Sequence, residues 1–179
     1  MLQIFNTSIP KGKRDLAICS LFLDSGLRVS EVCSLELSRV HLHDFYCDVF
    51  IKGGHWERAL FSEYTSSCID NWLSIRSSFA SPSCRSLFCS LGGNSSGSQL
   101  TREGLQRVVF YWGKEIGVKL SPHDLRRTFA TLATIAGAPS RLLQAAGRWS
   151  DISMVERYTR SIQVEGFRPY FPVNFVMRD

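Results

Sequence analysis

Residues 121–130 read Ser-Pro-His-Asp-Leu-Arg-Arg-Thr-Phe-Ala and lead into an apolar-periodic segment. The pattern predicts a helix from about residue 123 to residue 136. His123 and Arg126 are three residues apart and therefore share one helix face, whereas Leu125 and Phe129 lie on another. The stretch thus predicts a helix that carries two basic side chains on one side and packs through the other.

Other helices are predicted on both sides of this one, with one region of different character. Residues 40–61 are rich in β-formers and contain the turn Lys52-Gly53-Gly54-His55, which favours a hairpin or the last two strands of a three-stranded sheet. Residues 80–99 form a Ser/Gly-rich loop in which Leu87-Phe88 is a candidate short buried strand. The fold class is therefore mainly α with a small antiparallel β-sheet. The further helices are predicted at residues 12–25, 29–35, 62–79, 101–116, 140–146 and 151–159.

Length and composition indicate a single globular domain. The chain has 179 residues, and 44% of them are apolar, which excludes a wholly disordered protein. No apolar run approaches the ~18 residues of a membrane span, and residues 1–6 lack a signal-peptide pattern. We therefore expect a soluble intracellular protein with no membrane association.

The charge is unevenly distributed along the chain. Residues 1–100 carry nine basic and nine acidic side chains, whereas residues 101–179 carry twelve and seven, which accounts for the net charge of +5. A basic C-terminal half favours a polyanionic partner such as nucleic acid.

The six cysteines indicate buried, reduced thiols, because they contain no Cys-x-x-Cys pair and several lie among apolar residues. Trp72 and Trp112 lie on apolar helix stripes and are expected in the core. His41 and His43 lie close to Asp44 and Cys47, but the spacing matches no strong zinc pattern, so no metal site is predicted.

Three more motifs accompany the helix at residue 123. The segment Gly-Leu-Arg-Val-Ser-Glu-Val at residues 26–32 places Arg28 in the bend between two helices. Lys52 lies at the hairpin turn, and Tyr158 follows Trp149 by nine residues. In this order and spacing the chain resembles the catalytic domain of the tyrosine recombinases, the phage-integrase family of site-specific recombinases. The resemblance extends from about Asp15 to Arg160.

The resemblance implies the DNA breaking-rejoining fold and a transesterification at a DNA phosphodiester. Tyr158 would attack phosphorus and leave a 3′-phosphotyrosine and a free 5′-hydroxyl. Arg28 and Arg126 would hold the charged phosphate oxygens, and Lys52 would protonate the leaving 5′-oxygen. His123 would assist removal of the tyrosine proton or hold a phosphate oxygen. No metal and no cofactor is required.

Two more side chains have roles under this resemblance. The indole N–H of Trp149 can only donate a hydrogen bond to the phosphate, and its ring can pack against the helix of Tyr158. Glu31 would orient Arg28 or Lys52, with an exposed carboxylate that pairs with the helix dipole as the alternative. Contacts to the DNA backbone are predicted for Arg39, Lys119, Arg127, Arg141, Arg148, Arg157 and Arg160.

The chain departs from the family pattern in two places. Arg148 replaces the glycine of the commoner Leu-Gly-His sequence before the residue at position 149. The family usually has an N-terminal helical domain, whereas only about a dozen residues precede the first helix here. Residues 1–179 are therefore expected to form a single catalytic domain that lacks the N-terminal domain, either excised or naturally minimal, and to bind DNA weakly and in a salt-sensitive way.

The sequence leaves alternatives open for the docking of the C-terminal tail and for the function of the chain. On duplex DNA a homo-oligomer, a tetramer, is expected, and the aromatic tail at residues 161–179 would dock on a neighbouring protomer or fold back on its own core. A type IB topoisomerase-like DNA relaxase and a catalytically silent DNA-binding relative are the alternatives to a recombinase.

Overall fold

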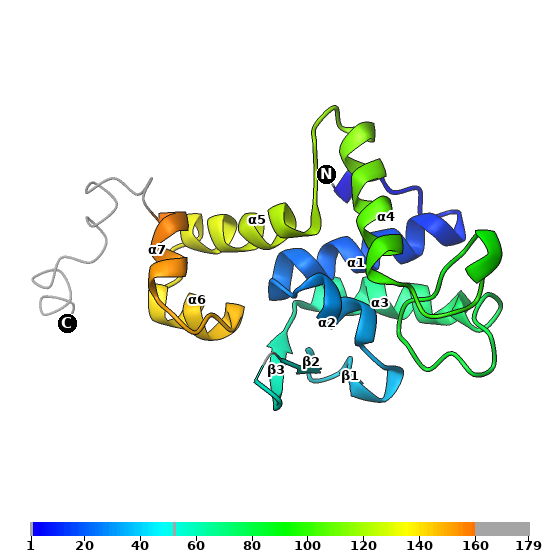
Figure 1. The fold of residues 1–179 in the computed structure, drawn as a ribbon, viewed down its shortest axis with the longest axis horizontal. Helices are drawn as coiled ribbons and strands as arrows, with labels where there is room; N and C mark the ends of the chain where they lie inside the picture. Colours follow the sequence, from blue (N-terminus) through cyan, green and yellow to red (C-terminus); the bar gives the residue numbers. More distant parts are fainter. Residues whose placement is uncertain (1, 52, 160–179) are drawn as a thin grey trace, which may run out of the picture.

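The computed structural model describes residues 2–51 and 53–159, with side chains up to residue 156 (Figure 1). Lys52, Arg160 and the tail at 161–179 lie outside the described residues, as do the side chains of Arg157 and Tyr158. The described part is mostly helical with one small antiparallel sheet, which confirms the predicted fold class. Its elements are α1 (Pro10–Ser25), α2 (Val29–Ser34), β1 (Val40–His41), β2 (Tyr46–Phe50), β3 (Trp56–Leu60), α3 (Glu63–Arg76), α4 (Arg102–Glu115), α5 (Pro122–Ile135), α6 (Ser140–Gly147) and α7 (Ser153–Thr159), with short 3₁₀ turns at Leu2–Ile4, Leu37–Arg39 and Gly93–Ser95.

Helix α1 is the centre of the main core and packs along α3. Its side chains Ile18, Leu21 and Phe22 are fully buried. Trp72 of α3 is also fully buried, and its indole N–H donates a 2.9 Å hydrogen bond to the carbonyl of Leu87. The expected core position of Trp72 is thereby confirmed, and its one polar atom is satisfied, as burial requires.

A buried carboxylate joins α1 to α4. Asp15 has no exposed surface, and its oxygens accept from Arg14 at 2.7 Å and from the indole N–H of Trp112 at 3.0 Å. Lys11 lies 3.3 Å from the same carboxylate. Because a buried charge is tolerated only when it is paired and hydrogen-bonded, this network fixes α4 against α1. Trp112 is a core residue, as predicted.

The sheet is a meander in the order β1-β2-β3. Strands β2 and β3 pair with Cys47 opposite Ala59 and Phe50 opposite Trp56. Cys47 and Ala59 face the core, and the two-residue periodicity places Phe50 and Trp56 where they are half exposed. The predicted hairpin is confirmed by the antiparallel pairing of β2 with β3.

The loop between α3 and α4 is held by one buried arginine. Arg76 donates to the carbonyls of Cys84 at 2.8 Å, Ser86 and Leu87 at 3.0 Å. Leu87 and its neighbour Phe88 are buried, as predicted. The short strand expected there does not form, since the loop pairs only through isolated bridges, one of them at Ser86.

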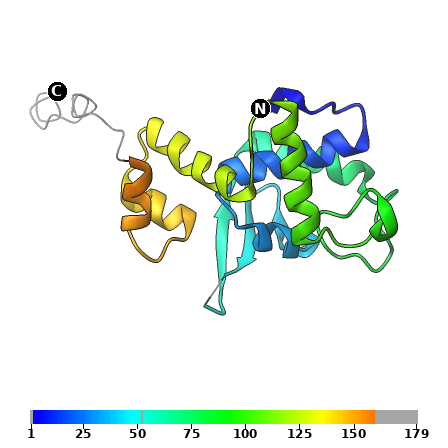
Figure 2. The ribbon, with the colours of Figure 1, turned by 45° about the horizontal axis from the view of Figure 1, so that its top comes forward.

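The described residues contain two hydrophobic clusters, and α5 contributes to both. Leu125, in the first turn of α5, belongs to the main cluster. Phe129, one turn later, belongs to a second cluster with Leu143, Trp149 and Val155. Figure 1 and Figure 2 show α5 running away from the main body towards α6 and α7. Helices α6 and α7 are therefore attached to the rest of the protein mainly through α5 and through polar contacts at the start of α5.

Five of the six cysteines are buried and Cys84 is half-buried, all as free thiols, which confirms the expectation from the sequence. Burial raises the pKa of the Cys19 and Cys47 thiols to about 12 and that of Cys33 to about 11. Within the part of the chain that the structure describes, no helix has the length and apolarity needed to cross a membrane.

These raised pKa values predict a loss of stability in alkali. Above about pH 9 the unfolded chain releases thiol protons that the native protein retains, so the free energy of unfolding falls as the pH rises towards 12. Between pH 8 and pH 9.5 the loss is about 1 kcal/mol per buried thiol. Urea titrations at the two pH values measure it, and Cys19→Ala and Cys47→Ala should each reduce the difference. An equal difference in all three chains would contradict the prediction.

Candidate active site

The bend between α1 and α2 places Arg28 beside Glu31. Gly26 ends α1 in the left-handed conformation, with φ 56°, and a side chain at this position would overlap the ring of Phe129. Two residues later the backbone N–H of Arg28 donates to Glu31 at 2.8 Å, and the Arg28 guanidinium contacts the same carboxylate at 2.7 Å. Glu31 is 3% exposed, so it orients Arg28 from beneath, and the exposed alternative is wrong.

The start of α5 presents His123 and Arg126. Ser121 caps the helix, and its hydroxyl donates to the Asp124 carboxylate at 2.6 Å, which lowers the pKa of Asp124. This reciprocal capping fixes where the helix begins and therefore which residues lie in its first turn. His123 is exposed there, and Arg126 is 6% exposed.

Arg126 joins the two hydrophobic clusters. Its guanidinium donates to the carbonyl of Gly26 at the end of α1 and to the carbonyl of Gly147 at the end of α6. The same guanidinium lies 4.6 Å from the ring centroid of Trp149. A planar, permanently charged fork suits both contacts, because it can bond two carbonyls while stacking on an aromatic ring.

Trp149 is a core residue that also lines a cavity. Its ring stacks on Phe129 at 6.1 Å between centroids and is 8% exposed. It also lines a cavity of about 320 Å³ together with Arg28, His123 and Arg126. Residues separated by more than 120 positions in the sequence thus surround one space.

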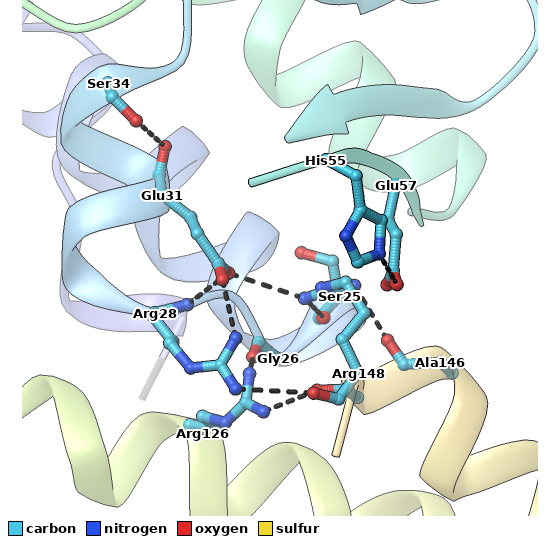
Figure 3. Close-up of polar contacts among 11 residues, drawn as sticks. Ser25, Gly26, Arg28, Glu31, Ser34, His55, Glu57, Arg126, Ala146 and Arg148 are labelled. Carbon is cyan, nitrogen blue, oxygen red and sulfur yellow. Dashed lines mark hydrogen bonds and ion pairs between the residues drawn. The ribbon is translucent and has the colours of Figure 1, made fainter. Parts of the chain in front are cut away.

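Figure 3 shows how closely the two predicted phosphate-binding arginines lie. Arg28 comes from the start of α2 and Arg126 from the start of α5, and both point towards the segment that follows α6. Arg28 donates to the carbonyl of Arg148 at 3.3 Å, next to the Gly147 carbonyl that Arg126 contacts. The structure therefore brings these two side chains together at the end of α6.

The hairpin turn flanks the same site. A second cavity, of about 710 Å³, is lined by Arg28 and Trp149 and also by Ile51, just before the turn, and by His55, the last residue of the turn. Lys52 itself lies outside the described residues. His55 contacts Glu57 at 2.9 Å; sequence reasoning did not select His55, and its only signal is its place in the turn.

Helix α7 brings the C-terminal end of the described chain to the cavity. Val155 is fully buried in the second cluster, and Met154 lines the 320 Å³ cavity. Position 158 follows Met154 by four residues, so the two positions share one face of α7. The helix predicted to carry the nucleophile therefore packs at the cavity, although the side chain of Tyr158 lies outside the described residues.

Four of the predicted DNA contacts are exposed: Arg39, Lys119, Arg127 and Arg141. The guanidinium of Arg39 lies 4.1 Å from the ring centroid of Trp56 on the sheet. Arg141 lines the 710 Å³ cavity beside Arg28. No contact of Arg157 or Arg160 is described.

The placement of Arg148 corrects the prediction of a contact to the DNA backbone. Its side chain is 1% exposed, with hydrogen bonds to the carbonyls of Ser25 at 2.9 Å and Ala146 at 2.8 Å. A guanidinium enclosed in this way does not reach a phosphate at the surface. The sequence signal that could have indicated this is the replacement of a small residue at a turn by a long side chain.

Replacing Gly147 with alanine is expected to destabilise the fold by at least about 1 kcal/mol, since overpacking costs roughly 1–3 kcal/mol. A Cβ at this position would overlap the ring of Trp149, which is held between Phe129 and Arg126. Urea unfolding followed by circular dichroism measures the effect. Gly92→Ala is the control, because a Cβ there meets nothing within 4 Å. Equal stability of both variants would contradict this packing.

Sequence comparisons with known proteins all point to the same family for this chain. A sequence profile of the phage integrase family matches residues 1–164. Tyrosine recombinase XerD of Listeria monocytogenes is 32% identical over 162 residues, which cover 89% of this chain and 54% of that protein. Tyrosine recombinase XerC of Haemophilus influenzae is 33% identical over 148 residues, or 82% of this chain and 48% of that protein. The chain thus spans about half the length of these curated relatives.

Solved structures agree with the fold. The crystal structure of XerA recombinase superposes with a TM-score of 0.74 at 25% identity, over 90% of this chain and 58% of XerA. XerH recombinase bound to its palindromic difH substrate gives a TM-score of 0.76 at 21% identity, over 94% and 48% of the two chains. With the family profile covering nearly the whole sequence, these matches show that the chain belongs to the phage integrase family.

Proposed function

We propose that the chain is the catalytic domain of a site-specific DNA recombinase or integrase. In the proposed reaction the oxygen of Tyr158 attacks a backbone phosphorus, and the bond from phosphorus to the 5′-oxygen breaks. The product is a 3′-phosphotyrosine, with a proton delivered to the departing 5′-oxygen. Reversal of the step on a second strand rejoins the DNA without an external energy source, because the phosphotyrosine keeps the energy of the phosphodiester.

The observation that carries the proposal is the convergence of Arg28, His123, Arg126 and Trp149 on one cavity. Attack on a phosphodiester gathers negative charge on the non-bridging oxygens. Two guanidiniums stay protonated at any relevant pH and can each bind phosphate oxygens through two N–H groups. Fixed positive charges of this kind stabilise the transition state without reorganisation during the reaction.

The proton transfers are assigned to the two remaining groups with suitable chemistry. Lys52 is proposed to protonate the 5′-oxygen from the hairpin that flanks the Arg28 site, since an ammonium is a compact proton donor. His123 is proposed to assist removal of the Tyr158 proton or to hold a phosphate oxygen. Trp149 is proposed to donate its indole N–H to the phosphate, and its stacking with Arg126 supports a positioning role as well.

The substrate and assembly proposed for this chain follow from the same chemistry. Duplex DNA would be held through its phosphates by Arg39, Lys119, Arg127, Arg141, Arg157 and Arg160. A tetramer on DNA, with residues 161–179 docked on a neighbouring protomer, is proposed for strand exchange. The protein would then act as an intracellular, DNA-associated enzyme, with residues 1–179 as one catalytic domain.

A suicide-substrate experiment tests the reaction. Duplexes with randomised arms and a nick next to the central position are incubated with the chain, so that cleavage releases a short fragment and traps the adduct. Covalent adducts are recovered by denaturing extraction, the bound DNA is sequenced, and the attached residue is identified by peptide mass spectrometry. We expect attachment at Tyr158 through a 3′-phosphate and recovery of a limited set of sequences.

The alternatives give different results in this experiment. A topoisomerase-like relaxase would form the adduct with little sequence preference and would relax supercoiled plasmid. A silent DNA-binding relative would retain DNA without any covalent product. Attachment through a residue other than Tyr158 would overturn the proposed mechanism.

A further inference from the structure

Arg148 occupies an unusual backbone position for its side chain. It ends α6 in the left-handed conformation, with φ 54° and ψ 45°, and is one of only two non-glycine residues with positive φ among those described. An L-residue is disfavoured there relative to glycine, because its Cβ approaches the following carbonyl. A side chain retained at such a position requires contacts that favour it.

Those contacts join the segment after α6 to the bend that carries Arg28. One Nη of Arg148 donates to the carbonyl of Ser25, the last residue of α1, and the other donates to the carbonyl of Ala146. Its own carbonyl accepts from Arg28 at 3.3 Å. Burial lowers the pKa of the Arg148 guanidinium, and the nearby Glu31 carboxylate opposes that shift.

Glu31 is shared by two guanidiniums. Arg28 contacts one carboxylate oxygen at 2.7 Å, and Arg148 lies 3.7 Å from the other (Figure 3). The Arg28 side chain is 38% exposed, whereas Arg148 is 1% exposed. Only Arg28 can therefore turn towards a substrate phosphate, and Arg148 stays beside the carboxylate when it does.

We infer that Arg148 is a positioning residue that keeps the Glu31 carboxylate compensated, so that Arg28 can leave it and bind the scissile phosphate. The inference rests on the proposed function of the Arg28 site. A carboxylate that is 3% exposed is costly without a cationic partner, so in the absence of Arg148 it would hold Arg28 more tightly. Arg148 thus acts on the reaction through Glu31 and Arg28 and does not contact DNA.

The test is the single-turnover rate of adduct formation on the substrate selected with the wild-type chain. Arg148→Met removes the charge and keeps most of the length, and we expect the rate to fall about 10- to 100-fold, within the range for residues coupled in one charged network. Arg148→Lys keeps the charge and should remain faster than Arg148→Met. The apparent affinity for DNA should change by less than about threefold, because Arg148 is buried.

Glu31→Gln supplies the readout that a merely structural role would not produce. In the wild-type background it should slow the reaction, because Arg28 loses its orienting partner. In the Arg148→Met background it should raise the rate by about threefold or more, because it removes the uncompensated carboxylate that retains Arg28. Urea unfolding of all variants separates these effects from loss of folding.

The outcomes distinguish the role inferred for Arg148 from the proposed function of the chain. The role of Arg148 would be overturned if Glu31→Gln slowed adduct formation by the same factor in both backgrounds. It would also be overturned if Arg148→Met and the wild-type chain formed adduct at equal rates. In both cases the proposed function would stand. Absence of any adduct with the wild-type chain would overturn the proposed function itself.

Discussion

A chain carrying Tyr158→Phe is expected to form no covalent adduct with nicked DNA under conditions in which the wild-type chain does. A phenyl ring has no oxygen to attack phosphorus, so the loss is complete rather than partial. Position 158 shares a face of α7 with Met154, which lines the cavity formed by Arg28, His123 and Arg126. Denaturing gels with labelled DNA measure the adduct directly.

The matched control for this variant is Tyr111→Phe. Tyr111 lies on α4 and is 56% exposed, and it takes no part in the cavities around Arg28. This variant should form adduct at the wild-type rate. An adduct with Tyr158→Phe, or its loss with Tyr111→Phe, would contradict the assignment of the nucleophile.

Arg126→Lys is expected to slow adduct formation by at least about 100-fold, as for removal of one fixed donor from a charge-stabilising site. A single ammonium cannot span the carbonyls of Gly26 and Gly147 and also stack on Trp149, as the guanidinium does. Because a buried carbonyl is left without its donor, the free energy of unfolding should fall by about 1–3 kcal/mol. Single-turnover cleavage and urea unfolding measure the two effects separately.

Arg107→Lys is the control for the same chemical change on an exposed surface of α4. It should leave the free energy of unfolding within about 0.5 kcal/mol of the wild-type value, and the activation free energy of cleavage within the same margin. An Arg126→Lys chain that cleaves within tenfold of the wild-type rate would show that the reaction does not depend on the guanidinium.

Arg126 has a structural role in this fold in addition to the chemical role proposed for it. The main cluster and the second cluster meet at the start of α5, where Arg126 bonds the ends of α1 and α6. The helix proposed to carry the nucleophile belongs to the second cluster through Val155. The contacts that orient Arg126, a proposed phosphate-binding group, thus also set where α7 lies relative to Arg28.

The local elements follow from the sequence because their signals are local. Pro10 and Gly26 delimit α1, the Ser121 to Asp124 cap starts α5, and Gly53-Gly54 marks the hairpin turn. Each depends on backbone preferences and on hydrogen bonds within a few residues. The one predicted strand that did not form, at Leu87-Phe88, depends instead on distant partners for its pairing.

The helices, the hairpin and the ordered set of basic and aromatic residues that marks the family can all be read from the sequence. The sequence does not show that Glu31 is buried under Arg28, that Trp149 is both a core residue and a cavity wall, or that the Arg148 side chain lies inside the protein rather than at its surface; these follow from the tertiary structure. The physical reason is that burial and charge pairing depend on which segments meet. Arg148 contacts Ser25 and Glu31 across more than 110 positions of sequence, a distance over which no periodicity or turn signal carries information.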